Sequence, residues 1–221
     1  QVVYFSSQTA LHDGYYYHEG MIYKAEKGEA EKVIATGDLK ILGGHNYENA
    51  AAAIAICQSM GVSLDLIRKG LREFEAVAHR IQFICETDGV AFYNDSKGTN
   101  PDAAIKAVLA MNRPTVLIGG GYDKESTYDE WIDSFGEKVK ALVLLGQTAD
   151  KIEACARKHG FTNIYRCESL EETVFKCASL AEEGDAVLLS PACASWGMFP
   201  NYEVRGQMFK ELVRALPVKE D

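Results

Sequence analysis

The stretch from Tyr93 to Pro101 holds the side chains best suited to binding or catalysis. It joins an apolar, strand-like run at 90–93 to a helix expected over 101–111. Asn100 can cap that helix, and proline suits its first position. Unpaired backbone N–H groups at such a helix start, beside a lysine and two hydroxyls, favour an anionic ligand. Polar strand-to-helix loops are also common without any ligand, so this loop alone predicts only a candidate site.

Two further polar segments follow apolar runs in the same way. The run 115–118 leads into Gly119-Gly120-Gly121-Tyr122-Asp123-Lys124, and the run 186–189 leads into Ser190-Pro191-Ala192-Cys193-Ala194-Ser195-Trp196. Each segment, taken singly, has an ordinary explanation as a surface turn. Because parallel strands end at one edge of a sheet, however, Thr99, Lys124 and Ser195 are expected to converge there. The three loops together predict a cradle for a small anion.

Strands and helices alternate from about residue 81. After a hairpin at 81–93, helices are expected at 101–111, 127–139, 148–159, 170–182 and 202–216, with strands at 115–118, 142–145, 164–167 and 186–189. Apolar strands separated by helices predict an α/β fold with a Rossmann-like, open and mostly parallel sheet covered on both faces.

The first 80 residues follow another pattern. Short β-like runs are expected at 2–5, 15–18 and 21–24, with a tight hairpin at Glu19-Gly20. A second hairpin is expected at 33–42 around Thr36-Gly37-Asp38, followed by two helices at about 45–60 and 64–74. These elements are too few for a complete core. The sequence therefore predicts a β-hairpin and two-helix remnant over 1–80 and a complete domain over 81–221, joined by a short hinge near 78–80.

Composition excludes several classes of function. The 221 residues carry a formal net charge of −9, with 47% hydrophobic residues, which disfavours a nucleic-acid backbone as partner and allows a full core. No apolar run approaches the ~20 residues of a membrane span, and no signal peptide is evident. The six cysteines lie mostly in apolar runs, as in a reducing cytoplasm. The start at Gln1, inside a strand-like run, suggests a fragment.

Cys155 and His159 lie one helical turn apart, but no second ligand pair is evident, so no metal site is predicted. A serine-hydrolase elbow of the form G-x-S-x-G is absent from the sequence. So is the phosphate-binding pattern G-x-x-x-x-G-K-[ST], and the chain by itself is therefore expected to be catalytically inactive.

Four motifs give the chain its resemblance to a known family. They are Gly44-His45-Asn46-Tyr47-Glu48-Asn49-Ala50-Ala51-Ala52, Ala78-His79-Arg80, the loop Asn94–Pro101, and Leu189–Ser195 continued by Phe199, Asn201-Tyr202-Glu203 and Arg205-Gly206. With these motifs the chain resembles the Mur ligases, most closely their D-glutamate-adding branch. Two positions depart from the usual pattern: Gly98 stands in place of alanine, which should loosen its loop, and Gly197 stands in place of a common aspartate.

The resemblance implies that 1–80 is the C-terminal portion of a central ATP-binding domain and that 81–221 is the amino-acid-binding domain. Such enzymes use ATP with Mg²⁺ to join an amino acid to a carboxylate through an acyl phosphate. Here the implied substrates are D-glutamate, ATP and UDP-N-acetylmuramoyl-L-alanine, in the cytoplasmic synthesis of peptidoglycan precursors that serves cell shape and division. A monomeric parent enzyme is implied, without nucleic-acid or membrane partners. The fragment is expected to self-associate through exposed apolar surface.

Residue roles also follow from the resemblance. ATP would be held by Asn46, Asn49, Arg80 and Asp95; D-glutamate would be held by Thr99, Lys124, Ser195, Trp196 and Tyr202. Catalytic roles fall to Lys97, as a positive charge near the phosphoryl group, and to Asp95. No protein ligand for a metal is implied. The rival hypothesis is a non-catalytic Rossmann-like module that binds an amino acid or a nucleotide.

Overall fold

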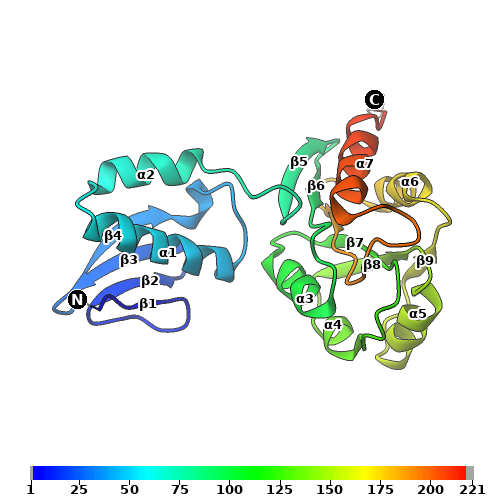
Figure 1. Ribbon diagram of the computed structural model, residues 1–221, viewed down its shortest axis with the longest axis horizontal. Coiled ribbons are helices and arrows are strands. Elements are labelled where there is room, and N and C mark those ends of the chain that lie inside the picture. Colours follow the sequence, from blue (N-terminus) through cyan, green and yellow to red (C-terminus); the bar gives the residue numbers. More distant parts are fainter. Residues whose placement is uncertain (1, 218–221) are drawn as a thin grey trace. The chain divides into compact units, whose positions relative to one another are not determined.

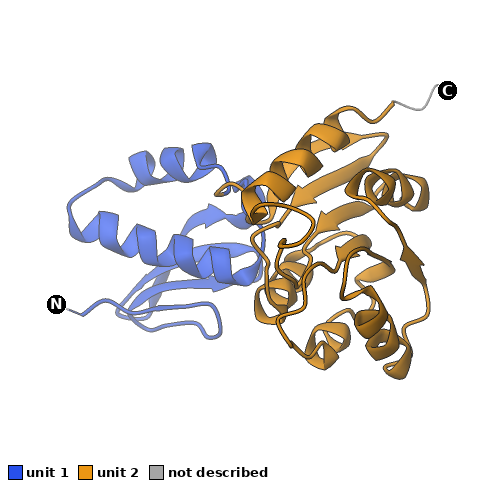
Figure 2. Cartoon of the chain, turned by 45° about the vertical axis from the view of Figure 1, so that its right-hand side comes forward, with its two compact units in different colours: residues 1–76 blue, residues 77–221 orange. Residues whose placement is uncertain are grey.

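The computed structural model describes residues 2–217. The chain divides into two compact units, residues 1–76 (unit 1) and residues 77–221 (unit 2), each with its own core (Figure 2). The division falls just before the segment 78–80, where the sequence indicates a hinge. None of the helices within the described residues is both long and apolar enough to cross a membrane.

Unit 1 is a four-stranded sheet with two helices. Its elements are β1 (Phe5–Ser6), β2 (Gly14–His18), β3 (Met21–Glu26), β4 (Glu29–Ala35), the 3₁₀ turn η1 (Thr36–Asp38), α1 (Gly44–Ser59) and α2 (Leu64–Glu73). The strand order is β1-β2-β3-β4, with β1 parallel to β2 and the remaining pairs antiparallel. Ala51 and Ile54 of α1 pack with Ile22 of β3 in the core of this unit, and all three side chains are fully buried.

Two-residue turns form the hairpins of unit 1. Glu19-Gly20 joins β2 to β3 and Lys27-Gly28 joins β3 to β4, and all four residues have positive φ, as a type I′ turn requires. The hairpin expected at Glu19-Gly20 is confirmed. The hairpin expected at 33–42 is wrong, because β4 runs unbroken from Glu29 to Ala35 and the following Thr36–Asp38 forms a 3₁₀ turn. The first four residues of β4 are exposed and mostly charged, so a search for apolar runs does not detect the full length of this strand.

Unit 2 is an α/β domain. Its elements are β5 (Gln82–Thr87), β6 (Val90–Asn94), α3 (Pro101–Ala110), β7 (Thr115–Gly119), α4 (Asp129–Asp133), β8 (Val139–Leu144), α5 (Ala149–Lys158), β9 (Ile164–Arg166), α6 (Leu170–Leu180), β10 (Ala186–Leu189) and α7 (Tyr202–Arg214). The strand order is β5-β6-β10-β7-β8-β9; only the edge strand β5 is antiparallel. The expected Rossmann-like, open and mostly parallel sheet is confirmed.

Helices cover both faces of this sheet. Helices α6 and α7 pack together on one face, while α3, α4 and α5 lie on the other (Figure 1). Every residue of β6, β7 and β10 is buried, which explains why these strands are apolar without alternation. Phe92 of β6 and Phe209 of α7 belong to one continuous core that spans the sheet and α7.

Caps fix where the helices begin. Asn100 Oδ1 accepts the N–H of Ala103 at 2.9 Å, and Ser169 Oγ accepts the N–H of Glu172 at 3.1 Å, as their spacing predicts.

The helix expected at 127–139 is wrong in extent. It ends at Asp133 because Gly136 turns the chain at positive φ, and β8 then begins at Val139, earlier than the expected 142.

The triple glycine lets three strand ends meet. Gly120 has φ +102°, and a Cβ there would overlap the carbonyl oxygen of Leu145 at the end of β8. Its N–H donates to the carbonyl of Pro191, in the loop after β10, at 2.9 Å. A Cβ on Gly121 would likewise overlap the carbonyl oxygen of Ala194. Side chains at these positions would force the loops after β7, β8 and β10 apart.

Substitution of Gly120 tests this constraint. We expect Gly120→Ala to lower the free energy of unfolding of unit 2 by about 3 kcal/mol or more, because backbone strain and overlap add. Gly184→Ala is the matched control, since Gly184 also has positive φ but faces open space; it should cost only about 1–2 kcal/mol. Urea unfolding followed by tryptophan fluorescence measures both, because the two tryptophans, Trp131 and Trp196, lie in unit 2. Equal losses would contradict the overlap.

Candidate functional site

Three loops adjoin at the carboxyl ends of β6, β10 and β7, which are neighbours in the sheet. The N–H of Asp95 donates to the carbonyl of Leu189 at 2.7 Å. On the other side of β10, the N–H of Tyr122 donates to the carbonyl of Ala194 at 2.9 Å. The segments that carry Thr99, Lys124 and Ser195 therefore share one edge of the sheet, as parallel strands require.

Asp95 lies at the base of this edge and is only 5% exposed. Its Oδ2 accepts the hydroxyl of Ser190 at 2.7 Å, and its Oδ1 accepts the N–H of Ile81 at 3.2 Å. Burial raises the pKa of the Asp95 carboxyl to about 7, against the opposing effect of these two hydrogen bonds. The side chain that is assigned to ATP binding and catalysis from the sequence is thus already hydrogen-bonded to Ser190 and Ile81 of the chain itself.

Gly98 does more than loosen its loop. A Cβ at this position would overlap Asp95 Oδ2 and lie 2.9 Å from Ser190 Oγ. The N–H of Gly98 donates to the carbonyl of Asp95 at 2.8 Å, which closes the turn over the carboxylate. Glycine at this position allows the loop backbone to pack directly on the Asp95–Ser190 pair.

A buried arginine joins two of the loops. Arg205, in the first turns of α7, is 2% exposed. Its Nε donates to Ser96 Oγ at 3.0 Å and its Nη2 to the Ser96 carbonyl at 2.8 Å, while Nη1 donates to the Cys193 carbonyl at 3.2 Å. Burial lowers the pKa of the guanidinium to about 10, which leaves it charged at neutral pH. Arg205 therefore holds the loop after β6 against the loop after β10.

In the sequence Arg205 stands out only as part of a motif, and this role is not evident there. Arg205, Phe209 and Val213 recur every four residues and are all buried, so the arginine lies on the apolar face of α7. A charged residue in register with a buried helix face is the signal that could have revealed it.

Asn94 and His79 form a second polar contact beneath the same helix. Asn94 Nδ2 donates to the carbonyl of Gly206 at 2.9 Å and lies 3.1 Å from His79 Nδ1, and Asn94 Oδ1 accepts the N–H of Ser96 at 3.0 Å. Partial burial is the main cause that lowers the pKa of His79. Neither residue is assigned a role in the site from the sequence alone.

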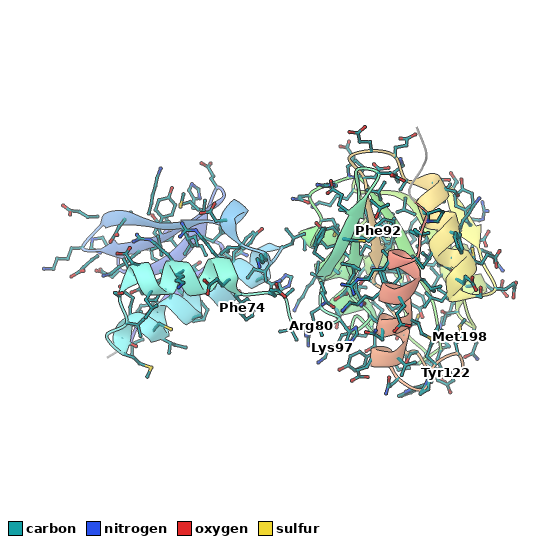
Figure 3. All side chains as sticks on the ribbon, turned by 90° about the horizontal axis from the view of Figure 1, so that it is seen from above. Phe74, Arg80, Phe92, Lys97, Tyr122 and Met198 are labelled. Carbon is teal, nitrogen blue, oxygen red and sulfur yellow. The ribbon has the colours of Figure 1, made fainter. Side chains whose placement is uncertain are left out.

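The backbone beside His79 is strained. His79 and Ile81 have φ of +64° and +44°, a region that a β-branched side chain rarely occupies. The two residues flank Arg80, which is exposed, and the carbonyl of His79 accepts the N–H of Lys97 at 3.1 Å. Figure 3 shows the Arg80 and Lys97 side chains at the same edge of unit 2. Two cations thus border the loop after β6.

The residues assigned to D-glutamate differ in exposure. Ser195 is buried and Thr99 and Tyr202 are half-buried, whereas Lys124 and Trp196 are exposed. Trp196 packs edge-on against Tyr122, with ring centroids 5.6 Å apart. Lys97 Nζ lies 5.4 Å from the ring centroid of Tyr202. Figure 3 shows Tyr122 and Met198 apart from Arg80 and Lys97, so the Tyr122–Trp196 pair lies in another part of unit 2 than these two cations.

The residues assigned to ATP are divided between the units. Asn46 and Asn49 lie in the first turns of α1 in unit 1, where Asn46 Nδ2 donates to the carbonyl of Leu42 at 2.7 Å and Asn49 is exposed. Arg80 and Asp95 belong to unit 2. Joint action of these four residues on one nucleotide stays a proposal.

Comparison with known proteins identifies the family. The family described as "Mur ligase, glutamate ligase domain" matches residues 79–193, slightly more than half of the chain, and includes all of the loop from Asn94 to Pro101. The chain belongs to the Mur ligase family. The match extends from the strained His79 to the buried Cys193, and so spans the strands that form the candidate site.

Its relatives within the Mur ligases are similar along nearly the whole chain. A UDP-N-acetylmuramoylalanine–D-glutamate ligase of Lachnospira eligens is 50% identical over 215 residues, which is 97% of this chain and 48% of the relative. The protein of the same name from Thermoanaerobacter sp. is 51% identical over 96% of this chain and 47% of its own length. The chain therefore spans about half the length of these relatives.

Solved structures share the fold at lower identity. UDP-N-acetylmuramate–alanine ligase from Thermotoga maritima matches with a TM-score of 0.61 at 20% identity, over 88% of this chain and 42% of that one. Folylpolyglutamate synthase from the same organism matches with a TM-score of 0.58 at 17% identity, over 90% and 44%. MurF ligase from T. maritima, solved in complex with ADP, gives 0.53 at 19%, over 91% and 46%. These likenesses confirm the architecture.

The buried carboxyl of Asp95 predicts a pH dependence of stability. The pKa of Asp95 is about 7 in the folded state and near 3.9 in the unfolded state. Between these pH values the folded chain binds the proton more tightly than the unfolded chain does, so the free energy of unfolding falls as pH rises. Asp95→Asn removes the titration and keeps both hydrogen-bond partners. We expect the stability of Asp95→Asn relative to the unsubstituted chain to increase by on the order of 2–3 kcal/mol between pH 5 and pH 8.

Urea unfolding at a series of pH values, followed by tryptophan fluorescence, measures this difference. Asp102→Asn is the control, because Asp102 is exposed in the first turn of α3. A stability difference for Asp95→Asn that stays constant with pH would contradict the assignment.

Proposed function

We propose that the chain is the part of an ATP-dependent D-glutamate-adding ligase that holds the amino acid and one side of the nucleotide, in the cytoplasmic synthesis of peptidoglycan precursors. The observation that carries the proposal is the identity of about 50%, over 97% of the chain, with a protein named UDP-N-acetylmuramoylalanine–D-glutamate ligase. The complete enzyme would use UDP-N-acetylmuramoyl-L-alanine as acceptor.

The residues of the chain fit an anionic amino acid. Lys124 lies between Asp123 and Glu125 in a turn that is held by α5 and by the residues just before it. Asp123 Oδ2 pairs with Lys151 Nζ of α5 at 3.1 Å, and the N–H of Asp123 donates to Gln147 Oε1 at 3.3 Å. Lys124 itself makes no ion pair with any residue that the structure describes. An exposed, unpaired ammonium on a fixed turn is suited to binding a carboxylate of D-glutamate.

Thr99 and Ser195 would add hydroxyl donors from the two loops that Arg205 joins. Each hydrogen bond to a charged group contributes about 1.5–3 kcal/mol. Trp196 and Tyr202 would border the aliphatic part of the amino acid. Fixed positions matter here because the amine must be held in line with the activated carboxyl carbon.

For the nucleotide, the fit is partial. Arg80 is exposed beside Lys97 and is suited to a phosphate or ribose, while the Asp95 carboxylate already binds Ser190 and Ile81. We therefore assign Asp95 mainly to holding the loop and Lys97 to supplying positive charge near the reacting group. Bound ATP with Mg²⁺ would supply the phosphoryl group that activates the acceptor. The chain has no P-loop, so another part of the enzyme would hold the phosphates.

Replacing Lys124 tests the proposal in the full-length enzyme. Lys124→Ala should raise the KM for D-glutamate by about 10- to 100-fold, the loss of one charged hydrogen bond, with a smaller effect on the KM for ATP. Phosphate release with D-glutamate varied at saturating ATP and acceptor is the measurement. An unchanged KM for D-glutamate would remove Lys124 from the site.

Two controls accompany this assay. Lys106→Ala alters an exposed lysine of α3 outside the three loops and should leave the KM for D-glutamate unchanged. The isolated 221-residue chain should release no phosphate, because it has no P-loop; turnover by the isolated chain would contradict the proposal that it is only part of the catalytic unit.

A further inference from the structure

A second cluster of chemically capable side chains lies on α4 and α5 of unit 2. One ligand atom each from Asp129, Cys155 and His159 lies within 4.8 Å of the other two. All three side chains are half-buried, and none belongs to the three loops of the candidate site. Figure 1 shows α4 and α5 as neighbours on one face of the sheet.

Two of these side chains share one face of a helix. Cys155 is in the last turns of α5 and His159 is its C-terminal cap, four residues on, so their side chains lie one above the other. The sequence shows this pair but no partner for it. The fold supplies the partner, since Asp129 begins α4 and Asp133 ends it, and both carboxylates contact the histidine.

The histidine is held in the orientation that a metal ligand needs. His159 Nδ1 donates to Asp133 Oδ1 at 2.6 Å, and Nε2 faces Asp129 Oδ1 at 3.0 Å. Histidine ligands in metal sites commonly have one ring nitrogen on a carboxylate and the other on the metal. Asp133 thus occupies the position of the orienting carboxylate, while Asp129 lies at the other ring nitrogen and Cys155 lies within 4.8 Å of the group.

We propose that Asp129, Cys155 and His159 bind a divalent cation of the zinc type, oriented by Asp133. Thiolate, imidazole and carboxylate are the three ligand types that zinc prefers, and ligand atoms already within 4.8 Å of one another need only small side-chain shifts to reach bond lengths of about 2.0–2.3 Å. A water molecule completes four-coordination. On binding, the Cys155 thiol and His159 Nε2 each lose a proton to solvent, and the Asp129–His159 hydrogen bond is replaced by two metal bonds.

Two neighbouring features oppose cation binding at this site. Lys158 Nζ lies 3.1 Å from Asp129 Oδ1 and repels a cation, but its side chain is 73% exposed and can turn into solvent. The hydrogen bond to Asp129, and to a smaller extent the one to Asp133, raises the pKa of His159, so a proton competes with the metal. A bound metal would tie α4, which follows the Lys124 turn, to α5, and so would stabilise that turn.

Cobalt titration of the reduced, metal-free 221-residue chain tests the site. We expect one equivalent of Co²⁺ to produce a thiolate-to-cobalt charge-transfer absorption that Zn²⁺ abolishes by displacement. Cys155→Ser should remove the absorption and His159→Gln should weaken binding at least about tenfold. Cys85→Ser is the matched control, because Cys85 is also half-buried but lies on β5, and it should leave the titration unchanged.

Two further variants separate this site from incidental binding to free thiols. Asp133→Asn should weaken binding about 10- to 100-fold through loss of the orienting carboxylate. Lys158→Ala should strengthen it about two- to fivefold, the worth of one exposed ion pair. Absorption that survives in Cys155→Ser, absence of Co²⁺ binding, or unchanged affinity in both His159→Gln and Asp133→Asn would overturn the proposal.

Discussion

The hydrogen bonds of one buried guanidinium constrain the arrangement of the candidate site. Arg205 binds the hydroxyl and carbonyl of Ser96 in the loop after β6 and the carbonyl of Cys193 in the loop after β10. A buried cation is costly unless its donors are satisfied, so the two loops must keep the positions that supply these oxygens. The fit between α7 and the sheet thereby fixes loops that are far apart in the sequence.

Arg205 with these three hydrogen bonds forms a clamp between the two loops. Around this clamp the loops are rigid at their base and exposed at their tips. The base contains Asp95 with Ser190, the glycines that allow backbone contact, and the Asn94 contact to α7. The tips carry Lys124 and Trp196, and Arg80 is exposed in the segment before β5. A rigid base with exposed polar and aromatic groups suits binding of a small polar molecule, because little ordering is left to the moment of binding. The same frame explains why burial, rather than a neighbouring charge, dominates the pKa of Asp95.

Features encoded by neighbouring residues could be predicted from the sequence. The Asn100 cap, the turn at Glu19-Gly20 and the parallel, two-sided sheet follow from local residue types and apolar runs. The insertion of β10 between β6 and β7 could not, because strand order depends on long-range pairing. Nor could the Arg205–Ser96 contact, which joins residues 109 positions apart, or the approach of α4 to Cys155 and His159. Short motifs indicated the candidate site, whereas the contacts that support its loops join residues far apart in the sequence.

Amide hydrogen exchange of Arg205→Met tests the role of the clamp most directly. We expect exchange to accelerate at least about tenfold in residues 95–99 and 192–196, where the guanidinium holds the backbone, while β7 and β8 keep their protection. Arg214→Met, at the exposed end of the same helix, is the control and should change neither region. Uniform acceleration across unit 2, or unchanged exchange in both loops, would contradict the account.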